Sequence, residues 1–195
     1  MQFKLCTEVI LLGDAAFICE VEQDERSVNG SGNARPDHCH QCRPPVPWNT
    51  SKTHKILEHV AMHLLFDDTV DASRELCGLC MRESPFCAFY LRKGKGAGSA
   101  PQVDYRISRC PNLTGKFLYS AAAKERTNSP CTNMPIICPL CPSTSPTVWK
   151  YNMKIHLAKN HPSIRSDEFQ HYEISQSEKA AIKLQWDKRH KVLQS

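Results

Sequence analysis

The sequence predicts an α+β fold of small zinc-stabilised modules, in which two divergent ββα-like two-Cys two-His (C2H2) fingers flank a Cys-rich β-hairpin region and a C-terminal helix follows. Two observations lead to this prediction. The 195 residues include 13 Pro and 11 Cys, and few segments are long and periodic. No core of ordinary size is therefore expected, and small modules need a metal or a disulfide to hold them together. Cys and His also recur in pairs at the spacing of zinc ligands.

Composition divides the chain into five segments. Residues 1–37 combine one or two apolar strands with a polar, flexible linker that begins at residue 23. The remaining segments are a divergent C2H2-like finger (38–67), a Cys-rich β region (68–137), a second C2H2 finger (138–162) and a helical tail (163–195).

The clearest motif is Cys138-Pro-Leu-Cys141, followed after fourteen residues by His156 and then by His161. A tight turn lets two thiolates face one ion, and two His about one helical turn apart place both imidazoles on one helix face. The motif predicts a zinc site with these four ligands: Cys138, Cys141, His156 and His161. Met153 stands where such a finger usually carries an apolar core residue.

A less regular copy of this motif comes earlier, where Cys39 and Cys42 precede His59 and His63. The segment from Thr53 to Leu65 lacks Gly and Pro and repeats apolar residues every four positions, so it predicts a helix with both His on one face. The intervening loop holds three Pro and is longer than the usual ~12 residues. We expect a second zinc site here, with three other His as alternative ligands: His38, His40 and His54. The competing interpretation is a His pair without a metal.

A third cluster begins with the thiolate pair Cys77 and Cys80, which enclose Gly78 in a tight turn. Two more thiolates are needed, and three Cys are available: Cys87, Cys110 and Cys131. We favour Cys110 and Cys131, since each lies beside a Pro in a turn-like context. Cys87 falls in an apolar run that resembles a buried strand, where free Cys is common. A redox pair needs a βαβ context, which the sequence does not indicate.

The remaining secondary structure is read from alternation and capping signals. Residues 86–91 and 103–107 predict a hairpin whose basic loop lacks the order of a phosphate-binding loop, and residues 117–120 predict a third strand. Ser175 to Glu178 forms a capping-box pattern before a helix over residues 179–193. Ala180, Leu184 and Trp186 are expected on the apolar face of that helix, which more plausibly packs on the core than binds a partner.

The ordered set of motifs resembles a family of uncharacterised C2H2-type zinc-finger proteins of mushroom-forming (basidiomycete) fungi. The residues that carry the resemblance are Cys77-Gly-Leu-Cys80, the run from Phe86 to Gly96, Cys110-Pro-Asn-Leu, Pro130-Cys131-Thr-Asn-Met-Pro, Cys138-Pro-Leu-Cys141 and the run from Val148 to His156. The likeness covers residues 39–195. It implies zinc binding by Cys138, Cys141, His156 and His161, and it implies no established activity.

Charge and hydropathy limit the classes of partner. No apolar run reaches the ~18 residues that span a bilayer, and Glu8 and Asp14 interrupt the apolar first residues, so neither a membrane span nor a signal peptide is expected. An intracellular protein keeps its thiols reduced and free to bind metal, and we expect a nuclear location.

The net charge is +5, with an acidic N-terminal segment and a basic stretch over residues 91–126. This distribution is compatible with contact to DNA phosphates.

The residues at the positions that usually contact bases give weaker support for base recognition than the charge gives for phosphate contact. Counting back from His59 in the first finger gives Lys52, Lys55 and Glu58. Counting back from His156 in the second finger gives Trp149, Asn152 and Ile155. The candidate nucleic-acid contacts are Lys52, Lys55, Asn152, Lys93 and Lys95. The alternative is a protein-interaction module without DNA binding.

An enzyme is not expected, because a catalytic zinc keeps an open position whereas both finger motifs offer four ligands. No small-molecule substrate is expected either.

Overall fold

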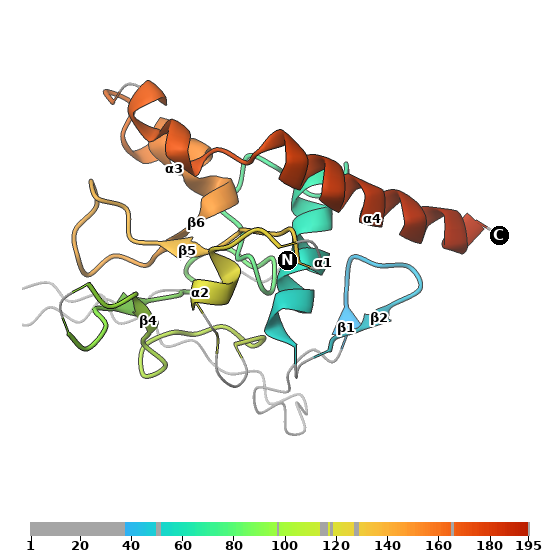
Figure 1. Ribbon diagram of the computed structural model, residues 1–195, viewed down its shortest axis with the longest axis horizontal. Coiled ribbons are helices and arrows are strands. Elements are labelled where there is room, and N and C mark those ends of the chain that lie inside the picture. The colour runs from blue at the N-terminus through green and yellow to red at the C-terminus, as the bar shows by residue number, and fades with distance from the viewer. Residues whose placement is uncertain are drawn as a thin grey trace, which may run out of the picture. The chain divides into compact units, whose positions relative to one another are not determined.

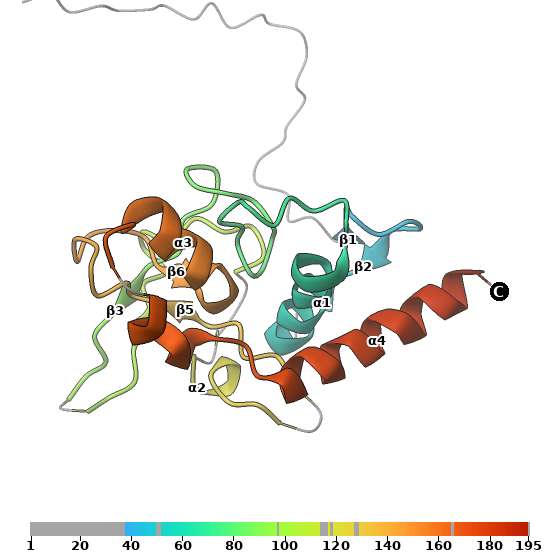
Figure 2. The same ribbon diagram turned by 90° about the horizontal axis from the view of Figure 1, so that it is seen from above.

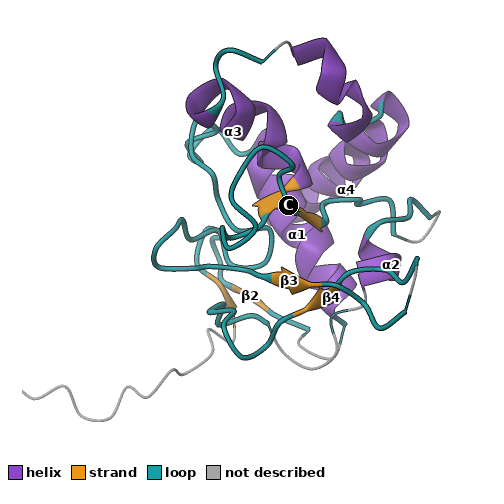
Figure 3. Cartoon of the chain, turned by 90° about the vertical axis from the view of Figure 1, so that its left-hand side faces the viewer, coloured by secondary structure: helices purple, strands orange, loops and turns teal. Residues whose placement is uncertain are grey.

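The computed structural model describes residues 38–49, 52–96, 98–113, 117, 119–126, 129–164 and 166–194. These residues belong to one unit, Ala34–Ser195. The strands and the linker that the sequence predicts over residues 1–37 lie outside the described residues. Loops make up much of the described chain (Figure 3). None of the described helices is long and apolar enough to cross a membrane.

The first segment is a short antiparallel strand pair followed by a helix (Figure 1). Strand β1 (His38–Cys39) pairs with β2 (Val46–Pro47), with Cys39 opposite Val46. Helix α1 (Thr53–Phe66) follows, as its uninterrupted apolar repeat predicts. Its inner face buries Ile56, Leu57, Val60 and Ala61.

The middle segment contains the predicted hairpin, with shorter strands than expected. Strand β3 (Leu91–Arg92) pairs antiparallel with β4 (Gln102–Val103), and an isolated bridge joins Ala88 to Arg109. The prediction of a third strand over residues 117–120 is wrong. Tyr119 and Ser120 instead begin the short helix α2 (Tyr119–Ala122), and Phe117 fills the core.

The third segment repeats the order of strand pair and helix. Strand β5 (Pro135–Ile136) pairs with β6 (Val148–Trp149), and a 3-10 turn η1 (Lys150–Asn152) leads into α3 (Met153–Asn160). A second 3-10 segment, η2 (Ser166–Tyr172), connects α3 to the long helix α4 (Gln176–Gln194). Helix α4 packs against α1 (Figure 2).

Helix α4 docks through only part of the face that the sequence predicts, since Trp186 packs as expected but Ala180 and Leu184 do not. Leu184 is 56% exposed and Ala180 is also exposed, whereas Ile182 is fully buried and Trp186 is partly buried against the core. The structure thus supports the preference for core packing and corrects the residues that do it.

One larger core joins segments that the sequence predicts as separate modules. Trp149 of the third segment stacks edge-on against Phe89, with ring centroids 5.2 Å apart, and also contacts Phe117. Gly78 lies directly beneath Trp149, because a Cβ atom there would come within 2.5 Å of the indole ring. The backbone at Gly78 therefore needs glycine for this close approach, and the modules share apolar contacts.

Candidate metal centres

The structure brings Cys39, Cys42, His59 and His63 into one buried group, with all four ligand atoms within 4.8 Å of one another. The Cys42 sulfur lies 3.4 Å from His59 Nε2 and 3.2 Å from His63 Nε2. Strand β1 and the turn after it supply the thiols, and successive turns of α1 supply the imidazoles. This group can hold a metal ion.

In each imidazole of this first centre, Nε2 faces the thiols and Nδ1 meets a second side chain that holds the ring in place. Asp67, the residue after α1, lies 2.6 Å from Nδ1 of His63. Nη1 of Arg189 of α4 lies 2.5 Å from Nδ1 of His59, a place where a ligand His more often meets a carboxylate or a carbonyl. Burial and, secondarily, the Arg189 charge lower the pKa of His59, which keeps the imidazole neutral, the form that binds metals.

The two thiols of the first centre differ in acidity. The hydrogen bond from Cys42 lowers the pKa of Cys39, while the reciprocal bond raises the pKa of Cys42. Burial opposes the charge on His63, but its bonds to Cys39 and Asp67 raise the pKa of that imidazole above its usual value.

The central group consists of Cys77, Cys80, Cys87 and Cys110, again with ligand atoms within 4.8 Å of one another. The sulfurs of Cys77 and Cys110 are 3.8 Å apart. The backbone N–H of Leu79 donates to the Cys77 sulfur at 3.4 Å, as expected of a tight thiolate turn. Bonds from Cys110 and Cys77 lower the pKa of Cys80, and burial raises the pKa of Cys77.

The expectation of Cys131 as the fourth ligand is wrong, and Cys87 takes its place. The run from Ser84 to Phe86 is a turn rather than a strand, in which the Cys87 amide bonds to the Glu83 carbonyl and Phe86 is 75% exposed. This turn carries the Cys87 sulfur to the thiolate pair.

Cys131 lies in the core, away from all three groups. Its thiol donates to the carbonyl of Leu57 at 3.7 Å and accepts from the Tyr151 hydroxyl at 3.6 Å. Burial raises the pKa of Cys131 to about 12, so it remains a neutral thiol.

The third group is the one with the clearest motif: Cys138, Cys141, His156 and His161. The Cys141 sulfur lies 3.3 Å from His156 Nε2 and 3.2 Å from His161 Nε2. The loop between β5 and β6 supplies the thiols. Helix α3 supplies His156, and His161 directly follows its last residue.

A carboxylate from another segment fixes one imidazole of this third centre. Glu75 lies 2.9 Å from Nδ1 of His156 and also accepts from Asn160. The bond to Glu75 raises the pKa of His156. Burial opposes ionisation of Glu75, but its bonds to His156 lower the pKa of the carboxyl below its usual value.

Three of the residues at the predicted base-reading positions are buried: Glu58, Trp149 and Asn152. Asn152 is 5% exposed and donates to the Leu76 carbonyl at 2.6 Å, and Trp149 is part of the core. Glu58 is buried and pairs with Lys55. Asn152 is thus occupied in holding the chain together, which corrects its proposed role in adenine recognition. Lys52, Lys93 and Lys95 are exposed.

The alternative His ligands stay outside the first group. His38 and His40 contact each other, with ring centroids 4.9 Å apart, and His54 lies one turn before His59. Sequence reasoning missed Asp67, Glu75 and Arg189, and it considered Cys87 but set it aside. Asp67 alone had a local signal, since it follows His63 by four residues, whereas Glu75 and Arg189 meet their partners only through tertiary packing.

Compared with known proteins, the chain matches no family model, no curated protein and no solved structure.

Proposed function

We propose that each of the three groups holds one structural Zn²⁺ and that the chain is a non-enzymatic zinc protein. Tetrahedral zinc, at about 2.3 Å from sulfur and about 2.0–2.1 Å from nitrogen, places neighbouring ligand atoms about 3.3–3.8 Å apart. The ligand-atom pairs in closest contact are 3.2–3.8 Å apart, and every pair within a group lies within 4.8 Å. This agreement carries the proposal.

The donor sets also favour zinc over other metals. Two groups offer two thiols and two imidazoles, and the central one offers four thiols. Soft tetrahedral sites of this kind suit zinc, and four protein ligands leave no open position for a substrate. Bound zinc would contribute folding free energy to a chain whose described strands are each two residues long.

Native mass spectrometry of the full chain, purified under reducing conditions, tests the proposal. We expect three zinc ions per chain, lost together with the fold when the metal is chelated. A folded, metal-free protein with its cysteines in disulfides would overturn it.

We further propose that the chain contacts DNA, in the nucleus, through phosphates rather than base edges. The supporting observation is the burial of Asn152 and Trp149, together with the exposure of Lys93 and Lys95 beside the β3–β4 turn. Lysine ammonium groups attract phosphate without reading sequence.

Fluorescence anisotropy with duplex DNA at several salt concentrations tests this second proposal. The double variant Lys93→Gln/Lys95→Gln should bind more weakly and reduce the slope of log affinity against log salt by about 2. Lys188→Gln, an exposed change on α4, serves as the control.

Absence of DNA binding, with tight binding to a protein partner, would favour the protein-interaction alternative. The exposed apolar side chains of Phe86, Tyr105 and Ile107 are candidate contacts for such a partner.

A further inference from the structure

A cavity of about 570 Å³ lies beside the third centre, between α3 and the segment that runs through η2 into α4. Figure 2 shows this part of the chain from α3 through the orange-red η2 to the start of α4. Apolar side chains that line the cavity include Met153, Leu157, Phe169, Tyr172 and Ile174. The rings of Phe169 and Tyr172 are stacked, with centroids 6.1 Å apart and 17° between their planes. The walls can therefore pack against an apolar body.

The charged lining is predominantly cationic. Lys150, Lys154 and Lys179 line the cavity, and Glu173 is the one acidic side chain among the described residues of the lining. Lys154 and Lys179 are exposed and take part in no ion pair within the described chain. The lining thus has an excess of positive charge next to an apolar wall.

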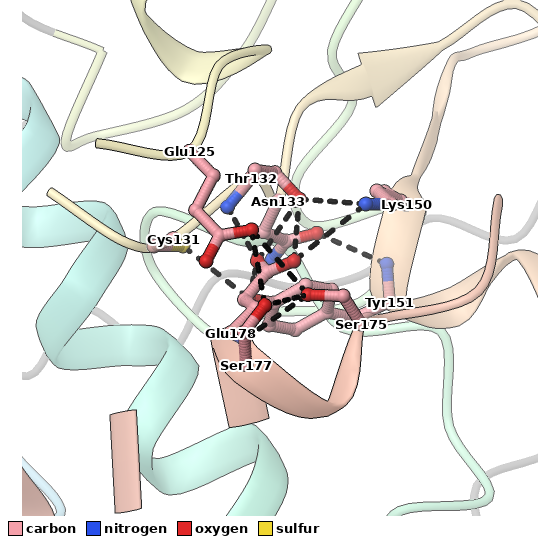
Figure 4. A network of polar contacts seen from close by, with 9 residues as sticks. All are labelled: Glu125, Cys131, Thr132, Asn133, Lys150, Tyr151, Ser175, Ser177 and Glu178. Atoms are coloured by element: carbon pink, nitrogen blue, oxygen red, sulfur yellow. Dashed lines mark hydrogen bonds and ion pairs between the residues drawn. The ribbon is translucent and has the colours of Figure 1, made fainter. Parts of the chain in front are cut away.

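Lys150 is held in place by a buried network (Figure 4). Its ammonium donates to the Thr132 hydroxyl at 2.6 Å and lies 3.7 Å from a carboxylate oxygen of Glu178, which is 1% exposed. Glu178 in turn accepts from the Tyr151 hydroxyl at 2.5 Å. The charge of Lys150 is thus balanced by Glu178, and the network holds this side chain in place at the cavity wall, while Lys154 and Lys179 supply the excess positive charge of the lining.

His161 adds a hydrogen-bond donor. Three of the four imidazoles in the metal groups have a partner at Nδ1, namely Arg189, Asp67 or Glu75. Nδ1 of His161 has none within the part of the chain that the structure describes, and His161 lines the cavity. An imidazole that ligates metal through Nε2 carries a proton on Nδ1 and usually donates it to an anionic or carbonyl oxygen.

We propose that this cavity binds a small organic acid, with a carboxylate beside Lys154, Lys179 and His161 and an aliphatic or aromatic body against Phe169, Tyr172 and Leu157. The volume falls within the ~300–1,000 Å³ of small-molecule sites, which combine apolar walls with a few polar groups. The ligand is bound and not converted, so the proposal goes beyond the structural zinc role. It also departs from the expectation of a chain without small-molecule partners.

Isothermal titration of the zinc-loaded full chain with three probes tests the ligand class. Decanoate, kept below its aggregation concentration, supplies both the carboxylate and the apolar body. Decanol supplies only the chain, and acetate supplies only the charge. We expect saturable one-site binding of decanoate and at least tenfold weaker binding of the other two. Equal binding of decanol, or no binding of decanoate, would overturn the proposal.

Matched variants locate the site. Lys154→Gln and Lys179→Gln should each weaken decanoate binding about threefold, because one exposed charge pair is worth a fraction of a kcal/mol. Lys159→Gln, also exposed on α3 but outside the lining, should leave the affinity unchanged. Ala158→Trp should block the cavity from its exposed rim, and zinc content measured in parallel shows that the variant is folded. Equal affinity of the Lys154, Lys179 and Lys159 variants, or undiminished binding to a folded Ala158→Trp protein, would place decanoate elsewhere and refute the assignment.

Discussion

At the residue scale, the turn before Cys87 determines which four thiols form the central group. Because Ser84 to Phe86 turn instead of continuing as a strand, Cys87 meets the Cys77–Cys80 pair, while Cys131 stays beneath the Tyr151 hydroxyl. Both cysteines are buried. Burial alone therefore does not distinguish a ligand from a core thiol, whereas the neighbouring atoms do.

This difference predicts opposite behaviour for two conservative variants. Cys87→Ser should lower the zinc content by one ion per chain, since a hydroxyl is a poor substitute for a thiolate ligand. Cys131→Ser should retain all three ions. Native mass spectrometry of both variants under reducing conditions makes the comparison. Loss of zinc from the Cys131 variant with retention in the Cys87 variant would reverse the assignment.

The carboxylate behind His156 predicts a second effect. Glu75→Gln keeps the size of the side chain but removes the charge that orients the imidazole, and such partners contribute about 10- to 100-fold in metal affinity. We expect zinc affinity at the third centre to fall about tenfold, measured by competition with a chromophoric chelator. Glu83→Gln is the control, because the Glu83 carboxylate pairs with Arg74 on the surface and contacts no residue of the third centre. Equal affinities of the two variants would show that Glu75 has no role in holding the metal.

At the scale of elements, a buried carboxylate attaches α4 to the core. Ser175 caps the helix by accepting from the Glu178 amide at 3.0 Å, as the capping-box pattern predicts. The Glu178 side chain accepts from the backbone and hydroxyl of Thr132 and from Tyr151. Its place in the sequence indicates a helix start, while its contacts join α4 to the segment before β5.

The same network predicts the cost of neutralising Glu178. Hydrogen bonds to a charged group contribute about 1.5–3 kcal/mol, so Glu178→Gln should lower the free energy of unfolding of the zinc-loaded protein by about 2 kcal/mol. Glu173→Gln, an exposed change three residues before Gln176, should stay within ~0.5 kcal/mol of the parent. Urea unfolding followed by circular dichroism compares them. A parent-like Glu178→Gln protein would mean that the carboxylate charge does not stabilise the docked helix.

At the scale of the whole described unit, the three centres are connected to one another. Glu75 precedes the central thiolate pair and contacts a ligand of the third centre, while Arg189 of α4 contacts the first. Gly78 lies against Trp149, which packs on Phe89 between the central thiols and β3. Tandem fingers that read DNA are separated by linkers, whereas these centres are joined by polar and apolar contacts between their segments.

We therefore expect the fold to lose its metals cooperatively. Titration of the zinc-loaded protein with a strong chelator should remove the helical circular dichroism signal and the zinc in one coincident transition. Zinc content and ellipticity are measured on the same samples. Release of one ion at a time, with the helical signal largely retained until the last, would show that the modules are independent.

The local motifs could be predicted from the sequence because their geometry is local. Cys138 with Cys141 and His59 with His63 come together within one turn or one helix face, and the helix over Thr53–Phe66 follows from its uninterrupted apolar repeat. Spacing in the chain is sufficient to place such ligands in pairs.

Only the tertiary structure decided how the pairs are completed and what surrounds them. The choice of Cys87 over Cys131, the burial of Asn152 and the inward turn of Ile182 instead of Leu184 all depend on residues distant in sequence. Where the described strands are only two residues long, packing between segments outweighs local propensity, and sequence spacing carries no record of those contacts.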